Sequence, residues 1–416
     1  MFANDLGGKA QLQRDSSQKN TGAAAAGSSA GQQLPTEQGG LPPRIVEFIA
    51  AKDLPSPCLV VDVDVVEHNY QTMTQALPLA NVYYAVKANP AVEILQRLDK
   101  LGSNFDTASP GEIDMCLNLG IAPSRISYGN TIKKQADIAY AYGKGIRLFA
   151  FDSESELQKI AQSAPGSQVY CRILVKSGGA EWPLSRKFGC TPKMALDLLI
   201  KAQALGLDSY GVSFHVGSQQ TNLDRWEPAI TKVAEMFKKA KAKGVDLRLI
   251  NMGGGFPSRY RQAVHPVGDY AEKIMATLTE QFGADIPRII LEPGRSLVGD
   301  AGVIQAEVVL ISKKGDGRGR RWVYLDIGKF SGLAETMDEA IKYRLVTPHD
   351  GGPTGPVVLA GPTCDSADIM YEKTDYELPL DLKEGDKVLI LATGAYTTTY
   401  SAVSFNGFAP LHAVCI

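Results

Sequence analysis

Residues 82–101 read VYYAVKANPAVEILQRLDKL, an apolar run followed by a short loop and then by apolar residues at helical spacing. Val82–Val86 is rich in β-branched and aromatic residues and predicts a buried strand, whereas Ala91–Leu101 predicts a helix. The same order of strand and helix recurs along the chain, with expected strands at 82–86, 103–106, 125–128, 147–151, 169–175, 210–216, 247–252 and 288–291. Eight such units predict an α/β fold, a parallel (β/α)8 barrel closed on itself, with an open doubly wound sheet as the alternative.

The pattern changes on both sides of these units. Residues 1–40 are mostly small and polar, with almost nothing to bury, and predict a disordered tail. Residues 41–70 contain a lead-in strand near Cys58 that we expect to join a β domain, and 71–299 form the barrel domain. Residues 300–416 predict that C-terminal β domain, because strands follow one another there without regular helices, at 303–311, 321–325, 357–359 and 388–391.

Composition argues against several classes of protein. The 416-residue chain carries a formal charge of −2, so no basic field would attract nucleic acid or an anionic membrane. Its apolar runs are too short to span a bilayer. Its six cysteines form no CxxC pair and its five histidines show no ligand spacing, so we expect no metal site. Because residues 1–40 lack the apolar core of a secretion signal, we expect a cytoplasmic protein.

Polar residues follow several of the expected strands, and active sites of such barrels lie at the C-terminal ends of the strands. Lys87 follows the first strand, Asp106 ends the second, and His215 lies near the end of the sixth. A lone lysine is usually a solvated loop residue. A lysine held in the mouth of a barrel can instead lose its proton and form an imine with an aldehyde cofactor. The shared position at one rim favours this second interpretation.

A phosphate site is the second expectation at this rim. Gly253-Gly254-Gly255 follows the seventh strand, and glycines let backbone N–H groups approach a phosphate closely. Arg295, in Glu292-Pro-Gly-Arg-Ser, would add a charged fork to the same anion. Glu292 is either the buried ion-pair partner of Arg295 or a carboxylate that keeps a pyridine nitrogen protonated. Ser218 would reach the phosphate, and His215 is either a core histidine or a ring stacked on the cofactor.

Together these segments resemble the fold-type III pyridoxal-phosphate decarboxylases, in particular the ornithine decarboxylase-like basic amino-acid group. The matching stretches are YAVKANP (84–90), FDTASPGE (105–112), FHVGSQ (214–219), GGGFP (253–257), EPGRS (292–296), PTCDSADIM (362–370), GAYT (394–397) and FNGF (405–408). They extend from the first barrel strand to the C-terminus. The resemblance implies an alanine racemase-like barrel with a C-terminal β domain, pyridoxal 5′-phosphate as cofactor, and a homodimer whose active sites are shared across the interface.

The resemblance also implies a role for each matching residue. The cofactor would be bound, with Glu112 bracing the site, by Lys87, Asp106, Arg172, His215, Ser218, Gly253, Gly254, Gly255, Glu292, Gly294, Arg295 and Tyr396. The implied catalytic residues are Lys87, which would carry the cofactor as a Schiff base, Cys364, His215 and Glu292. The implied substrate contacts are Asp365, Asp338 and Phe405, with Glu335 as an alternative to Asp338. Cys364 and Asp365 would come from the partner subunit, Cys364 as the acid that returns a proton to the substrate.

The reaction implied by the resemblance is the decarboxylation of L-ornithine to putrescine in polyamine biosynthesis. The stretch Asp326–Asp338 resembles bacterial ornithine/lysine decarboxylases, so L-lysine to cadaverine is a second expected reaction. One methylene separates the two substrates and is worth roughly 1–3 kcal/mol in a pocket. The alternatives are a decarboxylase of diaminopimelate or of another basic amino acid, and a non-catalytic, regulatory pyridoxal-phosphate-binding homologue. Glu292 argues against a racemase, in which an arginine faces the pyridine nitrogen.

Overall fold

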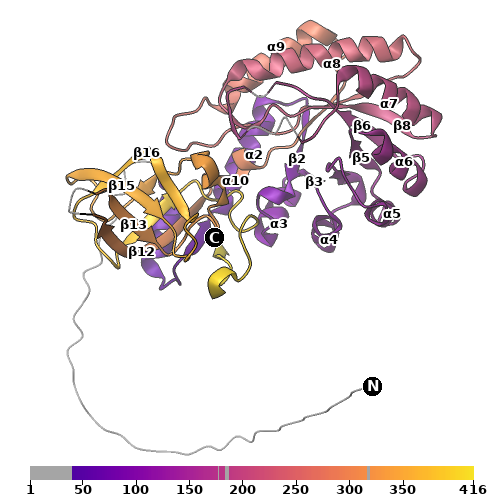
Figure 1. Ribbon diagram of the computed structural model, residues 1–416. Helices are drawn as coiled ribbons and strands as arrows, with labels where there is room; N and C mark the ends of the chain where they lie inside the picture. Colours follow the sequence, from indigo (N-terminus) through magenta and orange to yellow (C-terminus); the bar gives the residue numbers. More distant parts are fainter. Residues whose placement is uncertain (1–39, 177, 183–186, 316–318) are drawn as a thin grey trace, which may run out of the picture. The chain divides into compact units, whose positions relative to one another are not determined.

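The computed structural model describes residues 40–176, 178–182, 187–315 and 319–416 (Figure 1). The expected disordered tail lies, apart from Gly40, outside the described residues. The two units of the chain are Met1–Gln33 and Leu34–Ile416, and all described residues belong to the second.

Eight strands form a closed barrel in the order β10-β11-β2-β3-β4-β5-β6-β8. The strands are β2 (Ala80–Ala85), β3 (Asn104–Thr107), β4 (Ile126–Tyr128), β5 (Leu148–Phe151), β6 (Gln168–Arg172), β8 (Asp208–Ser213), β10 (Leu249–Asn251) and β11 (Arg288–Leu291). Every neighbouring pair is parallel, including β11 with β2, which closes the barrel. The predicted (β/α)8 barrel is therefore confirmed, and the open doubly wound alternative is wrong.

Helices follow the barrel strands in the order the sequence predicts and surround them in Figure 1. They are α3 (Val92–Lys100), α4 (Pro110–Asn118), α5 (Gln135–Gly143), α6 (Glu154–Ser163), α7 (Pro192–Ala204), α8 (Trp226–Lys241) and α9 (Val267–Phe282). Local sequence sets several of their starts. Ser109 and Ser153 accept hydrogen bonds from the third backbone N–H of α4 and α6, and Thr191 does the same for α7.

The interior of the barrel is filled by side chains from its own strands. A buried cluster contains Tyr83, Leu148, Ala150, Tyr170, Tyr210, Leu249 and Ile290. Arg288, near the start of β11, donates hydrogen bonds to the hydroxyls of Tyr83 at 2.8 Å and Tyr210 at 3.3 Å. Because packed residues fill this part of the interior, a ligand is restricted to the C-terminal mouth of the barrel.

The C-terminal strands form a sheet of eight strands with the main order β14-β17-β12-β13-β15-β16. They are β12 (Gly302–Lys313), β13 (Arg321–Leu325), β14 (Leu345–Val346), β15 (Thr354–Ala360), β16 (Ile369–Pro379), β17 (Lys387–Leu391) and β18 (His412–Cys415). The lead-in strand β1 (Cys58–Val61) pairs with β12 and β18, as expected of a strand that joins this sheet. Sequence analysis missed β14, β16 and β18.

The segment before the barrel contains more helix than expected. Helix α1 (Pro43–Ala51) packs Ile45 and Ile49 against β-sheet residues such as Leu389. Helix α2 (Val63–Ala76) instead packs against α3 and α9 of the barrel, so it runs across the boundary expected at residue 70. The chain passes from the β sheet to the barrel between β1 and α2.

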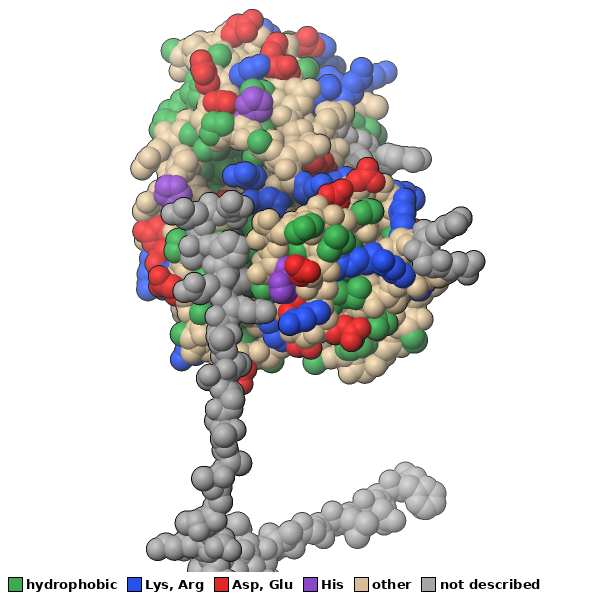
Figure 2. Space-filling model, turned by 90° about the vertical axis from the view of Figure 1, so that its left-hand side faces the viewer, with side chains coloured by type: hydrophobic (Ala, Val, Ile, Leu, Met, Phe, Trp, Pro, Cys, Tyr) green, Lys and Arg blue, Asp and Glu red, His purple; other side chains and the backbone are tan. Residues whose placement is uncertain are grey.

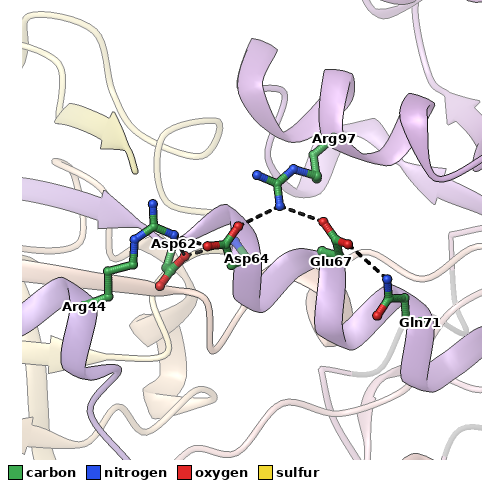
Figure 3. A network of polar contacts seen from close by, with 6 residues as sticks. All are labelled: Arg44, Asp62, Asp64, Glu67, Gln71 and Arg97. Carbon is green, nitrogen blue, oxygen red and sulfur yellow. Dashed lines mark hydrogen bonds and ion pairs between the residues drawn. The ribbon is translucent and has the colours of Figure 1, made fainter.

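Charged side chains join α1, α2 and α3 at the surface (Figure 3). The members of this network are Arg44, Asp62, Asp64, Glu67, Gln71 and Arg97. Arg97 lies 2.7 Å from both Asp64 and Glu67, and Arg44 lies 2.9 Å from Asp62 and also contacts Asp64. Single exposed ion pairs contribute about 0–1 kcal/mol, so the network matters mainly as a link between three helices.

The surface carries charges of both signs. On the face shown in Figure 2, Lys and Arg side chains lie among Asp and Glu side chains. Within the described part of the chain, no helix is both long and apolar enough to cross a membrane. The described residues also contain no group of three or more His, Cys, Asp or Glu side chains arranged to hold a metal ion.

Candidate active site

A cavity of about 280 Å³ lies at the C-terminal ends of the barrel strands. It is lined by Ala85, Lys87, Asp106, Gly129, Arg172, Phe188, His215, Ser218, Gly254, Gly255, Phe256, Glu292, Gly294, Arg295, Glu335, Tyr396 and Tyr400. These residues follow or end seven different barrel strands, and Glu335, Tyr396 and Tyr400 are added from the C-terminal part of the chain. The structure thus brings together nearly all of the cofactor residues expected from the sequence.

Lys87 stands on the short 3-10 turn η1 (Val86–Ala88), directly after β2. Protein surrounds its side chain, yet much of its surface remains accessible because it faces the open cavity. Burial by itself would lower the pKa of the Lys87 amine, but the neighbouring Asp106, Tyr396 and Glu292 raise it above its usual value. The loss of the Lys87 proton that was considered from the sequence therefore has to overcome the neighbouring acidic groups. The carboxylates at the same rim reverse the effect of burial.

Asp106, near the end of β3, is buried and accepts a hydrogen bond from Ser127 at 3.0 Å. Burial, together with repulsion from Glu292, raises its pKa well above the usual range for a carboxyl group, against the opposing effect of Lys87. The position also requires Gly129 opposite, because a Cβ on Gly129 would lie 2.0 Å from an Asp106 carboxylate oxygen. Asp106 is therefore a buried acidic side chain whose surroundings disfavour its charged form.

His215 follows β8, and its surroundings favour the uncharged imidazole. Burial lowers its pKa well below the usual value, and the nearby charges of Arg172 and Lys87 act in the same direction. Its Nδ1 accepts a hydrogen bond from the backbone N–H of Gly217 at 3.0 Å, which leaves the ring proton on Nε2. Arg172 lines the same cavity, with its guanidinium 5.2 Å from the Phe188 ring centroid. The site therefore presents a flat, uncharged imidazole beside a cation.

Glu292 and Arg295 have separate partners. Glu292 accepts a hydrogen bond from the Asn251 side chain at 2.5 Å, and the other end of that amide accepts the backbone N–H of Gly253 at 2.9 Å. No hydrogen bond or ion pair joins Glu292 to Arg295 among the described residues. The simple account in which Glu292 is only the counter-ion of Arg295 is therefore wrong.

The glycine loop approaches other backbone segments closely. A Cβ on Gly254 would lie 2.5 Å from the carbonyl oxygen of Glu292, and a Cβ on Gly255 would lie 2.6 Å from that of Gly217. The N–H groups of Gly254 and Gly255 donate to no acceptor in the described chain. They border the cavity and suit an anion. Gly253 does not line the cavity, and its N–H is already donated to Asn251, so the structure does not place it in the expected phosphate site.

Arg295 opens the short helix α10 (Arg295–Val298), and its side chain is almost completely buried. Its guanidinium forms an ion pair with Glu335 at 2.5 Å and donates to the Tyr260 hydroxyl at 2.6 Å and to Ser218 at 3.2 Å. The Tyr396 ring lies 4.9 Å from the guanidinium carbon. Gly294, just before it, leaves room for the Tyr396 hydroxyl, which a Cβ there would approach at 3.2 Å.

The remaining expected residues do not line this cavity. Cys364 and Asp365 are exposed, and Cys364 contacts Asn406, to which its backbone N–H donates at 3.2 Å. Phe405 is partly exposed and packs against Phe330, with ring centroids 5.1 Å apart. Asp338 is exposed, whereas Glu335 is buried in the cavity wall. Of the two acidic residues weighed as substrate contacts, the chain therefore brings Glu335 to its own cavity.

Sequence analysis missed several residues of the site. Gly129, Phe188, Tyr260 and Tyr400 carried no motif, and Tyr260 touches the cavity only through Arg295. A glycine directly after a barrel strand, as at Gly129, was the one available signal. No sequence signal indicated the pairing of Arg295 with Glu335, because it joins two segments whose spacing follows no pattern.

Comparisons with known proteins show the family to which the chain belongs. Residues 63–299 match the family model described as pyridoxal-dependent decarboxylase, pyridoxal binding domain. The lysine/ornithine decarboxylase of Selenomonas ruminantium is 37% identical over 364 residues, which cover 86% of this chain and 89% of that protein.

Two solved structures also resemble the chain over most of its length. SrLDC in complex with PLP and cadaverine matches with a TM-score of 0.80 and 35% identity. The match covers 90% of this chain and 94% of the SrLDC chain. Lysine/ornithine decarboxylase from Vibrio vulnificus, complexed with cadaverine, matches with a TM-score of 0.81 and 30% identity. This match covers 90% of this chain and 99% of the Vibrio chain. The chain belongs to the family of pyridoxal-dependent decarboxylases, with the alanine racemase-like fold of type III.

Proposed function

We propose that this chain is a pyridoxal 5′-phosphate-dependent decarboxylase of basic amino acids, with L-ornithine as the first substrate and L-lysine as the second. One observation carries the proposal. The Lys87 amine, the Glu292 carboxylate and the N–H groups of Gly254 and Gly255, which have no acceptor among the described residues, border a single cavity in the barrel mouth. The relatives that cover most of the chain are named for these two activities.

The chemistry of the residues that border the cavity suits the cofactor. Gly254, Gly255 and Gly294 form a cradle in which added Cβ atoms would collide with neighbouring atoms, and the Arg295 cation lies beside it. When bound, pyridoxal 5′-phosphate supplies an aldehyde that condenses with amines and a ring that accepts the electron pair of a departing carboxylate. Lys87 provides the amine for attachment and Glu292 provides an anionic acceptor for a protonated ring nitrogen.

The chain's other groups orient the reactants and manage protons. Neutral His215 offers an uncharged flat face, so it adds no repulsion to a cationic ring. Asp106 and Glu292 hold the proton on the Lys87 amine, and this amine must lose the proton before it attacks an aldehyde. Phe188 and Tyr400 add aromatic surface to the cavity wall, where they would exclude water from a bound cofactor.

We further propose a homodimer in which Cys364 and Asp365 complete the partner's site. Both residues are exposed and lie outside the cavity of their own chain, although they belong to a segment that resembles the family's catalytic one. The Cys364 thiol would return a proton to the substrate carbon after carbon dioxide leaves. Asp365, with Glu335 from the cavity wall, would bind the distal ammonium of the substrate.

Release of carbon dioxide from four substrates tests the proposal. Purified chain with added cofactor is given ornithine, lysine, arginine and diaminopimelate side by side at matched concentrations. We expect the highest kcat/KM for ornithine. The kcat/KM for lysine should be lower by at most about 200-fold, because one methylene separates the two substrates. Preference for diaminopimelate would support the alternative decarboxylase. No release from any of the four would refute the enzyme and favour a regulatory homologue.

A further inference from the structure

Arg295 has no free donor with which to receive a phosphate. A guanidinium carries five N–H donors. Its Nε donates to Ser218 at 3.3 Å, and Nη2 donates to Ser218 at 3.2 Å and to Glu335 at 2.5 Å. Its Nη1 donates to Tyr260 at 2.6 Å and to Glu335 at 2.8 Å. Each of the donors already has a protein acceptor.

Glu335 is the strongest of these competitors. Its two carboxylate oxygens bind both terminal nitrogens of Arg295 in the fork geometry that a phosphate would also use. The side chains of both residues are almost fully buried, at 3% and 4% exposed, so water screens their attraction little. A phosphate that approaches the guanidinium must therefore displace this carboxylate or be repelled by it.

Charge in the cavity supports displacement. The cavity is lined by three cations, Lys87, Arg172 and Arg295, and by three carboxylates, Asp106, Glu292 and Glu335. A phosphate adds negative charge beside these acidic groups, and the electrostatic cost is smallest if the carboxylate nearest the anion site moves away. Ser218 is uncharged and can remain.

The segment that carries Glu335 can accommodate such a movement. Glu335 stands in the short 3-10 element η4 (Ala334–Glu339), which is not a regular helix. Within η4 the backbone leaves the helical region at Met337 and Asp338, and Gly332 precedes it at φ 140°. The few backbone bonds of this segment restrain the side chain less than an α-helix would.

We propose that Glu335 is an exchangeable counter-ion of Arg295. Its carboxylate pairs with the guanidinium until the phosphate of the cofactor displaces it. This inference rests on the proposed function for the identity of the phosphate ligand. Glu335 neutralises the buried arginine in the chain without cofactor, at the cost of weaker phosphate binding. After the exchange, its carboxylate is free in the cavity wall to accept another cation.

Binding of pyridoxine 5′-phosphate tests the exchange, because this probe carries the phosphate but no aldehyde and forms no bond to Lys87. Titration calorimetry compares the full-length wild type with Glu335→Gln, which removes the competing charge. We expect the variant to bind the probe at least about tenfold more tightly. Pyridoxine without phosphate should bind both proteins equally.

Glu181→Gln is the matched control, because Glu181 is close enough to Arg295 to feel its charge but forms no bond to its fork. Glu181→Gln should change the affinity for pyridoxine 5′-phosphate by less than about threefold if the direct contact of Glu335 with Arg295, rather than the negative charge in the region, weakens phosphate binding. Unchanged or weaker binding by Glu335→Gln, or equal tightening by the control, would overturn the inference. A wild type that binds neither probe nor cofactor would instead refute the proposed function.

A second measurement covers the case in which Glu335→Gln does not fold. Crystal structures of the wild type with and without pyridoxal 5′-phosphate compare the contact between Arg295 and Glu335 directly. We expect at least one of the two fork contacts, now 2.5 and 2.8 Å, to open beyond hydrogen-bonding distance when cofactor is bound. Retention of both contacts in the complex would contradict the exchange.

Discussion

Substitution of Asn251 by alanine is predicted to destabilise the site, although Asn251 does not line the cavity. Asn251 ends β10 and is completely buried. Its amide nitrogen donates to Glu292 and its amide oxygen accepts the N–H of Gly253. One side chain therefore fixes both the acidic group and the start of the glycine loop.

The expected loss follows from these two bonds. A hydrogen bond to a charged group contributes about 1.5–3 kcal/mol, and a buried N–H left without a partner costs about 1–3 kcal/mol. Glu292 borders the cavity, where water can replace the lost donor, so the two losses will not add in full. We expect Asn251→Ala to lower the free energy of unfolding by about 2–4 kcal/mol.

Urea unfolding of the purified protein measures this loss, with Asn81→Ala as the matched control. Asn81 is also an asparagine of a barrel strand, but it is exposed and donates one bond, to Ile289 at 3.1 Å. The control should lose less than about 1 kcal/mol. If Asn251→Ala were as mild as the control, the view that Asn251 organises Glu292 and the glycine loop would be refuted.

Two further predictions concern the dimer and the neutral histidine. Mixed dimers of Lys87→Ala and Cys364→Ala subunits should regain about a quarter of wild-type activity, since half of randomly assembled dimers are mixed and each has one intact site; no recovery in verified mixed dimers would contradict the shared site. For His215, the pKa in the folded protein is lowered well below its usual value of 6.5, so the unfolded chain binds an extra proton below that pH and stability falls as pH falls. His215→Phe should remove this contribution, so its stability relative to wild type should increase from pH 7 to pH 5 in parallel urea titrations; an unchanged difference would argue against a neutral His215.

The barrel could be predicted because its strands are buried on both faces and read as short apolar runs, as in Arg288–Leu291. Strand β16 was missed for the opposite physical reason. It ends the strand order of its sheet, and exposed residues such as Glu372, Lys373 and Asp375 interrupt its apolar pattern. Strand β14 has only two residues, and none of the four residues of β18 is buried, so neither strand gives an apolar signal.

The site shows the same division. Residues at strand ends, such as Lys87 and Asp106, could be placed because parallel strands of a barrel end at one rim. The net charge of Lys87 could not, since the pKa of its amine depends on carboxylates from other strands that only the fold brings close. The pairing of Arg295 with Glu335 likewise depends on how the C-terminal segment packs on the barrel.

The central claim is that the cofactor is attached to Lys87 in the barrel mouth. Borohydride reduction of the cofactor-loaded protein, followed by peptide mass mapping, tests it most directly, because reduction makes an imine linkage permanent. We predict a single modified lysine, Lys87, in the peptide that contains the YAVKANP sequence. Modification of another lysine, or of none, would contradict the account.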